Sequence, residues 1–292
     1  MNDSKKAFYS YIGLFFVAML WGLAFTVVKS SLDYVPPTYF VAIRFTVASI
    51  AISIIFAKKF KCFNKQNVLH GALIGVFLFF AYFTQTIGCN YTTAGKNAFL
   101  TALYVIVVPF LHWLITKKRP SYRLFIAAIL AIVGIGLISL GNDMSIGKGE
   151  LLSIACGVLF GCQIAYIDKY SETDDVMVLT MMQTYVSAIL GWIFAPFTDG
   201  AINADAFKST SVWLGILYIG IVSTLICNIL QNVCQKYTKP ENASLIMSTE
   251  SVFGVLGSII FLGEAPSVRM WIGCAIMMVA IVLAQLKTKE KS

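Results

Sequence analysis

YTTAGKNAFLTALYVIVVPFL (91–111) and YTKPENASLIMSTESVFGVLG (237–257) are two stretches of one chain that follow the same plan. Each begins with Tyr-Thr, reaches an Asn-Ala pair, and continues as an apolar run that carries small or hydroxyl-bearing residues. The doubled stretch indicates an internal repeat. How two such runs fold depends on whether water or lipid surrounds them.

The composition of the chain indicates lipid. Of the 292 residues, 58% are hydrophobic and only 12% are charged, and the mean hydropathy is +0.80. Soluble domains are about a quarter charged, and a soluble protein of this length could not bury so much apolar surface. A bilayer removes that difficulty because it solvates apolar side chains.

The apolar residues fall into segments of the length that a helix needs to cross a bilayer, which is about 20 residues. Ten such segments are predicted: 8–28, 38–57, 68–88, 95–115, 121–141, 148–168, 176–197, 212–232, 241–262 and 267–286. They are too long, and too apolar on all sides, for the alternating strands of a membrane barrel. Helices satisfy their own backbone groups in lipid, so the sequence predicts an all-α membrane protein with ten transmembrane helices.

The net charge of +8 is distributed as a membrane protein requires. Sixteen of the 22 basic residues lie in segments that alternate crossing places on the same side as the N-terminus. Basic residues concentrate on the cytoplasmic side of membrane proteins, which predicts a multi-pass protein of the cytoplasmic membrane with both termini in the cytoplasm. A folded basic face for nucleic acid is not visible in the sequence.

The repeat divides the chain into two five-helix units, 8–141 and 148–287. The matching pairs are Tyr91 with Tyr237, SYRLFIAAIL (121–130) with SVRMWIGCAI (267–276), and LWG (20–22) with LFG (159–161). Because each unit has an odd number of spans, the second unit must enter the membrane from the opposite side. Inverted repeats of this kind are typical of transporters, with the substrate site near the bilayer midplane between the halves.

Motifs in both halves resemble those of the EamA family in the drug/metabolite transporter superfamily. They are LWGLAFTVVK (20–29), RFTVAS (44–49), YTTAGKNAFLTALYVIVVP (91–109), LISLG (137–141), GELLSIACGVLFG (149–161), ASLIMSTESVFGVLGSIIFLGEAPS (243–267) and WIGCAIMMVAIVLA (271–284). The resemblance implies a ten-helix fold with a central cavity and the export or exchange of small metabolites. The family commonly has Glu-Pro in its ninth helix, where this chain has Glu250-Ser251, so a weaker kink is expected here.

A polar stripe occurs at matching positions in both repeats. The residues are Asn228, Gln231, Asn232 and Gln235, and, 146 residues earlier, Tyr82, Gln85, Thr86 and Cys89. The spacing i, i+3, i+4, i+7 places each set on one helix face. Two interpretations stay open, because amides in hydrocarbon need water or partners: the stripes line a substrate cavity, or they form hydrogen bonds between helices, each worth about 0.6 kcal/mol.

Three charged residues are candidates for substrate binding. Arg44 lies inside the second span and Glu250 near the middle of the ninth, where a charge costs at least about 2.5–3.5 kcal/mol. Arg44 could instead reach the interface with its long side chain, and Glu250 could be a neutral packing carboxyl. Lys96 lies near the start of the fourth span, where it could attract an anion or remain a solvated loop lysine.

Aromatic residues complete the candidate site. Trp21 and Tyr104 are predicted to stack on a substrate, although membrane aromatics also serve as packing. With Tyr82 and Gln85, with Asn228, Gln231 and Asn232, and with the three charged residues, they make up the predicted substrate-binding set.

The sequence favours transport over catalysis. GNDMSIGK (141–148) does not have the spacing of a nucleotide-binding loop, and no zinc-protease or serine-hydrolase motif is present. The seven cysteines form no C-x-x-C pair and the two histidines are isolated, so no metal or cofactor is predicted. We therefore expect a secondary transporter of a small metabolite, such as an amino acid or similar amphiphile, that exports it by alternating access, with Glu250 as a candidate site for proton coupling. An integral membrane enzyme and a passive channel are the alternatives.

Overall fold

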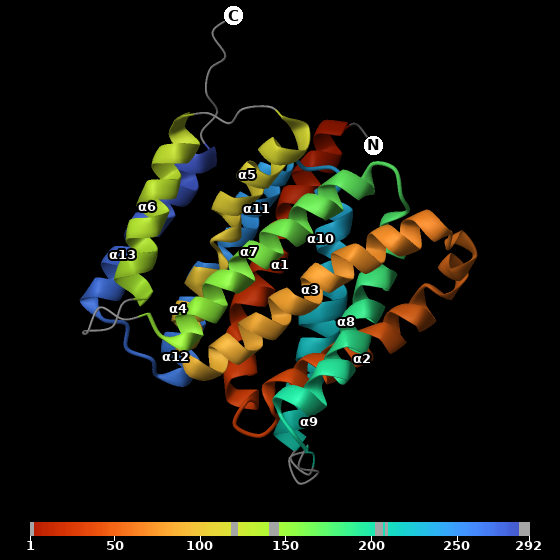
Figure 1. Ribbon diagram of the computed structural model, residues 1–292, viewed down its shortest axis with the longest axis horizontal. Coiled ribbons are helices and arrows are strands. Elements are labelled where there is room, and N and C mark those ends of the chain that lie inside the picture. The colour runs from red at the N-terminus through yellow and green to blue at the C-terminus, as the bar shows by residue number, and fades with distance from the viewer. Residues whose placement is uncertain (1–2, 118–121, 140–145, 202–206, 208–209, 286–292) are drawn as a thin grey trace, which may run out of the picture.

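The computed structural model describes residues 3–117, 122–139, 146–201, 207 and 210–285, and nearly all of them are helical (Figure 1). The helices are α1 (Asp3–Ser31), α2 (Pro37–Ile55), η1 (Ala57–Cys62), α3 (Lys65–Tyr91), α4 (Ala94–Thr101), α5 (Tyr104–Thr116), α6 (Tyr122–Ser139), α7 (Lys148–Ser171), α8 (Val176–Thr198), α9 (Thr210–Leu217), η3 (Tyr218–Ile226), α10 (Cys227–Gln235), α11 (Pro240–Ser248), α12 (Glu250–Leu262) and α13 (Val268–Gln285).

The helices account for the apolar segments of the sequence. Eight helical stretches are long and apolar enough to cross a membrane, and two shorter apolar helices are Phe125–Ile138 and Val268–Leu283. The protein is therefore an all-helical, multi-pass membrane protein. The predicted ends of the two repeats, 140–141 and 286–287, lie outside the described residues.

Two of the spans are broken near their middle. In the span that begins at Ala94, α4 ends at Thr101 and α5 begins at Tyr104. Around the break, hydrogen bonds such as Leu103 N–H to Leu100 O, 3.2 Å, reach back three residues instead of four. Pro109 lies inside α5 and has no N–H to donate to the preceding turn. The span that begins at Pro240 breaks in the same way at Thr249, 146 residues after Leu103.

The helix is interrupted before Glu250 although no proline follows that residue, and three hydroxyl groups bond to carbonyls of the same helix there. The Ser248 hydroxyl donates to the Leu245 carbonyl at 2.6 Å, the Thr249 hydroxyl to Ile246 at 2.7 Å, and the Ser251 hydroxyl to Ser248 at 2.8 Å. Side-chain hydroxyls that bond to nearby carbonyls compete with the helical ladder and bend it. The run Ser248–Ser251 therefore interrupts the helix directly before the carboxylate of Glu250.

A third irregularity lies in the span formed by α9, η3 and α10. Its central part, Tyr218–Ile226, is a π-helix. π-helical segments are rare in proteins, but those that occur are often found at functional sites. Ser223 and Thr224 in this segment contact two of the predicted site residues, as shown below.

The bundle has two ends, which we name for a lysine at each. The Lys59 side is where α2 and α7 end and α3 and α8 begin. The Lys96 side is where α1 and α3 end and α4 and α7 begin. The described part of α1 begins on the side of the bundle where the described part of α13 ends (Figure 1). α6 packs against α13 at one edge of the bundle.

An ion pair on the Lys59 side fixes the start of α8. Asp175 caps this helix by accepting from the Met177 backbone N–H at 2.9 Å, and Lys59 Nζ lies 2.6 Å from its carboxylate. Burial opposes ionisation of Asp175, but the hydrogen bonds from Lys59 and from the helix backbone outweigh it and hold the pKa of this carboxyl below its usual range. The hydrogen bond to Asp175 raises the pKa of Lys59.

Candidate functional site

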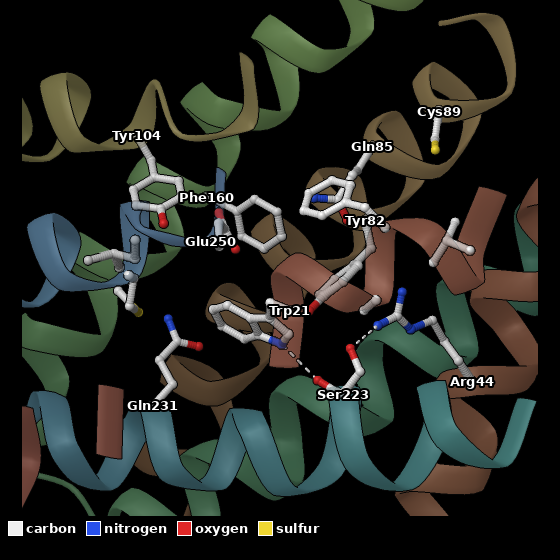
Figure 2. Close-up of a pocket in the computed structure, with 15 residues that line it drawn as sticks. Trp21, Arg44, Tyr82, Gln85, Cys89, Tyr104, Phe160, Ser223, Gln231 and Glu250 are labelled. Atoms are coloured by element: carbon white, nitrogen blue, oxygen red, sulfur yellow. Dashed lines mark hydrogen bonds between the residues drawn. The ribbon is translucent and has the colours of Figure 1, made fainter. Parts of the chain in front are cut away.

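A cavity in the middle of the bundle contains most of the predicted site residues (Figure 2). It is lined by side chains from both halves of the chain. Seven of the ten predicted residues line it: Trp21, Arg44, Tyr82, Gln85, Tyr104, Gln231 and Glu250. Its volume is about 30 Å³, which is room for about two water molecules. In this conformation the cavity is too small for a metabolite, which would enter only after the cavity expands.

Arg44 is a buried cation at one end of this cavity. Arg44 is 2% exposed, so its side chain does not reach the interface. The alternative interpretation, in which it does, does not hold in this structure. Nε donates to the Thr224 hydroxyl at 2.9 Å, and the guanidinium carbon lies 4.3 Å from the centre of the Tyr82 ring. No described carboxylate forms an ion pair with it. Stacking on an aromatic ring stabilises a desolvated guanidinium, and here the guanidinium also donates to two hydroxyl oxygens.

Glu250 is a buried carboxylate in another part of the cavity. It is 3% exposed and is the first residue of α12. Free backbone N–H groups and the helix dipole favour a negative charge at this position. Tyr104, 146 residues earlier, is the first residue of α5 and points into the cavity beside Glu250 (Figure 2). The two helix breaks therefore place a phenol and a carboxylate next to each other.

Trp21 and the π-helix form the wall between these groups. Trp21 Nε1 donates to the Ser223 backbone carbonyl at 2.7 Å, and the Ser223 hydroxyl lies 3.4 Å from Arg44 Nη2 (Figure 2). The wider turns of the π-helix change which carbonyls are paired along the backbone. The irregular segment thus orients an aromatic ring and a cation toward the same space.

The repeated polar stripe divides between the two interpretations that the sequence left open. Gln85 and Gln231 both line the cavity, and each also donates a hydrogen bond to another helix, Gln85 to the Thr101 hydroxyl at 3.5 Å and Gln231 to the Gln163 side-chain oxygen at 3.3 Å. Asn232 does not, and its amide donates to the Thr180 hydroxyl on α8 at 2.8 Å, which is an interhelical hydrogen bond. Asn228 is buried but does not line the cavity, and neither polar atom of its amide has a partner among the described residues.

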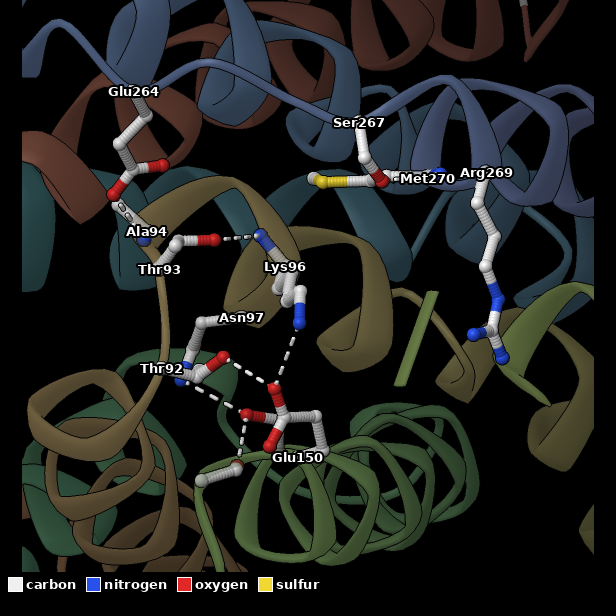
Figure 3. Close-up of polar contacts among 12 residues, drawn as sticks. Thr92, Thr93, Ala94, Lys96, Asn97, Glu150, Glu264, Ser267, Arg269 and Met270 are labelled. Carbon is white, nitrogen blue, oxygen red and sulfur yellow. Dashed lines mark hydrogen bonds and ion pairs between the residues drawn. The ribbon is translucent and has the colours of Figure 1, made fainter. Parts of the chain in front are cut away.

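Lys96 lies away from the cavity, on the Lys96 side. Its Nζ is 3.2 Å from the Glu150 carboxylate at the start of α7 (Figure 3). Glu150 is only 7% exposed, so the positive charge of Lys96 is partly neutralised by a buried carboxylate of the same chain. The structure does not bring Lys96 together with Arg44 and Glu250.

Several cavity residues were absent from the predicted set. Phe160 could have been found, because LFG (159–161) is the counterpart of LWG (20–22) and both central residues line the cavity. Cys89 belonged to the polar stripe. Ile164 and Met247 carry no signal in the sequence, since they resemble any apolar residue of a membrane helix.

Comparisons with known proteins agree with these observations. The sequence profile described as "EamA-like transporter family" matches residues 8–140 and 147–286. An uncharacterized transporter of Archaeoglobus fulgidus is 32% identical over 285 residues, which cover 98% of this chain and 88% of that protein. The uncharacterized transporter YvbV of Bacillus subtilis is 23% identical over 95% of this chain and 92% of its own length. One solved crystal structure matches with a TM-score of 0.68 at 18% identity, over 93% of this chain and 95% of that chain, which supports the fold alone.

Proposed function

Because the chain belongs to the EamA-like transporter family, we propose that it is a secondary transporter whose ten spans form two inverted five-helix repeats, 8–141 and 148–287. The breaks before Tyr104 and Glu250 support this proposal, since they occur at matching positions of the two halves. Discontinuous helices at a central site are typical of transporters built from inverted repeats.

The proposed substrate is an amino acid or a similar zwitterion with an apolar part. The observation that carries this proposal is the presence of one buried cation, Arg44, and one buried carboxylate, Glu250, at the same cavity. Arg44 would bind the substrate carboxylate and Glu250 the amine. Trp21 and Tyr82 would contact the apolar part, and Gln85 and Gln231 would complete the polar contacts.

The proposed mechanism is alternating access in the cytoplasmic membrane, with the Lys59 side in the cytoplasm together with both termini. A central cavity of only about 30 Å³ suits a carrier that exposes its site to one side at a time better than it suits a permanently open channel. Export is the proposed direction, as the family resemblance implies. Glu250 is also the proposed proton site, because it is a buried carboxyl at the cavity and has no ion-pair partner among the described residues.

The test is a flux assay with purified protein in liposomes. A labelled panel of amino acids is expected to show saturable uptake that unlabelled substrate on the opposite side accelerates. Uptake that neither saturates nor responds to counter-substrate would identify a channel, and a chemically altered product would identify an enzyme.

The same assay tests the proton role of Glu250. Glu250→Gln keeps the shape of the side chain but cannot titrate, so its flux is expected to lose the pH dependence of the wild type. Asp33→Asn is the control, because Asp33 is an exposed carboxylate between α1 and α2 and does not line the cavity. A Glu250→Gln variant with the rate and pH profile of the wild type would show that no proton passes through this residue.

A further inference from the structure

The turn between α3 and α4 is held by elements from several parts of the chain. Lys29, in the last turn of α1, donates from Nζ to the Cys89 carbonyl at 2.7 Å and to the Thr92 carbonyl at 2.9 Å. With a third bond to the Asn90 carbonyl at 3.4 Å, one ammonium group holds three carbonyls at the end of α3. These contacts join α1 to the edge of the cavity, because Cys89 also lines it.

A carboxylate from the other half of the chain holds the start of α4. Glu264, between α12 and α13, accepts from the Ala94 backbone N–H at 2.8 Å and from the Gly95 N–H at 3.2 Å (Figure 3). It satisfies N–H groups that have no partner within the helix. α4 is thus tied to the α12–α13 connection on the Lys96 side.

A second carboxylate from that half completes the closure. Glu150 accepts from the Thr92 hydroxyl at 2.7 Å and from Lys96 Nζ at 3.2 Å (Figure 3). The backbone is equally close here, since a Cβ on Gly149 would lie 2.8 Å from the Thr92 nitrogen. The start of α7 therefore contacts the α3–α4 turn through an ion pair, a hydrogen bond and direct backbone packing.

The Lys59 side contains a crevice along the same helices. A crevice of about 190 Å³ lies between α5, α7 and α11, with Val108, His112 and Asp168 among its lining residues. Tyr104, Val108 and His112 follow each other at four-residue intervals on α5, so the crevice lies on the helix face that continues from the cavity. The two sides of the cavity thus differ in how they are closed.

We propose that the ion pair between Lys96 and Glu150 is the lock of the Lys96 side, and that the transport cycle must break it to open the cavity there. Lys96 belongs to the first proposed repeat and Glu150 to the second, so rocking of the repeats separates them. Lys96 and Glu150 are therefore gating residues, which differs from the substrate-binding role that the sequence predicted for Lys96.

Native Cys89 reports on this lock. It is buried, lines the cavity and lies beside the clamped turn, so a water-soluble maleimide reaches it only when the Lys96 side opens. The experiment measures the labelling rate of each cysteine in purified full-length protein by peptide mass spectrometry. Exposed Cys62 gives the maximal rate, and buried Cys156 and Cys274 report general unfolding.

Glu150→Gln and Lys96→Met are each expected to raise the Cys89 labelling rate by on the order of fivefold, without a change at Cys156, because a partly buried ion pair is lost. Since both act on one pair, the double variant is expected to match the stronger single variant. Glu172→Gln removes a carboxylate at the other end of α7 and is expected to leave Cys89 unchanged. If Glu150→Gln does not fold, Lys96→Met still gives the test, because the Lys96 side chain is 28% exposed.

Unchanged Cys89 labelling in both single variants would overturn the proposal. The proposal would also be overturned if Glu172→Gln raised the Cys89 labelling rate as much as Glu150→Gln does. A double variant whose Cys89 labelling rate rises by the product of the two single effects would overturn it as well. The inference rests on the proposed transport cycle, but the labelling needs no substrate. A failed flux assay with an intact labelling response would therefore count against the proposed function and not against the lock.

Discussion

Arg44→Lys is the substitution that tests the substrate site most directly. A guanidinium has five N–H donors. In the structure one of them goes to Thr224 at 2.9 Å and another to Ser223 at 3.4 Å, while the group stacks on Tyr82. The remaining donors are available to a carboxylate in the cavity. Lysine keeps the positive charge but loses the planar fork and the stacking geometry.

The expected loss of affinity follows from these contacts. Replacing a two-pronged guanidinium contact by a single ammonium removes at least one charge-assisted hydrogen bond, which is worth about 1.5–3 kcal/mol. At about 1.4 kcal/mol for each factor of ten, the dissociation constant of a zwitterionic substrate should rise about 10- to 150-fold. Transport at saturating substrate should fall less, since the charge remains.

The assay is a binding titration with the amino acid that stabilises the purified protein most in a thermal-shift screen, and with the decarboxylated amine of the same side chain. The wild type is expected to prefer the amino acid, and Arg44→Lys to lose most of that preference. Tyr82→Phe is the matched control, because it keeps the ring that stacks on Arg44 and is expected to keep the preference for the amino acid over the amine.

Two results would refute this reasoning. One is an Arg44→Lys variant that binds the amino acid as tightly as the wild type does. The other is an equal loss of affinity for the amino acid and the amine, because a residue that contacts the carboxylate cannot weaken binding of a ligand that lacks it. Either result would leave Arg44 as a structural residue that supports α2 against the π-helix.

Three further predictions follow from the same structure. Gln85→Leu is expected to impair transport with little change in melting temperature, because Gln85 lines the cavity. Asn232→Leu should instead lower the melting temperature, because it removes a buried hydrogen bond worth about 1 kcal/mol. A lowered melting temperature for Gln85→Leu and a transport defect alone for Asn232→Leu would contradict this assignment. An impermeant maleimide applied to intact cells is expected not to label exposed Cys62, and labelling before lysis would contradict a cytoplasmic Lys59 side. Because the pKa of Asp175 is lowered in the folded protein, its contribution is complete above the unfolded pKa of about 4 and is lost as the pH falls through the folded value. Asp175→Asn keeps the helix cap but weakens the contact with Lys59. In acid-unfolding curves this variant should therefore lose less stability than the wild type between about pH 5 and pH 2, a range set by these pKa values. Identical curves would exclude this contribution.

The sequence by itself determined the class of fold and most of the cavity. A bilayer leaves helices as the structure for apolar segments of this length, so the helices could be located from composition and periodicity. Residues such as Arg44 and Glu250 stood out because charge is expensive in lipid. The repeat at a distance of 146 residues also related Gln85 to Gln231, which line the same cavity.

Only the tertiary structure decided which polar residues face that cavity and which face a neighbouring helix. Gln231 and Asn232 are adjacent in the chain, yet Gln231 lines the cavity and donates to Gln163 on α7, whereas Asn232 donates to Thr180 on α8, because successive residues of a helix point about 100° apart toward different neighbours. Lys96 likewise has the same local sequence whether it attracts a substrate or pairs with Glu150, 54 residues away. At the break before Glu250, three hydroxyl groups bond to carbonyls of their own helix. The sequence alone does not show whether these hydroxyls bond to their own helix or to a neighbouring one. Periodicity determines the face of a helix on which a side chain lies, and packing against distant segments determines what that face meets.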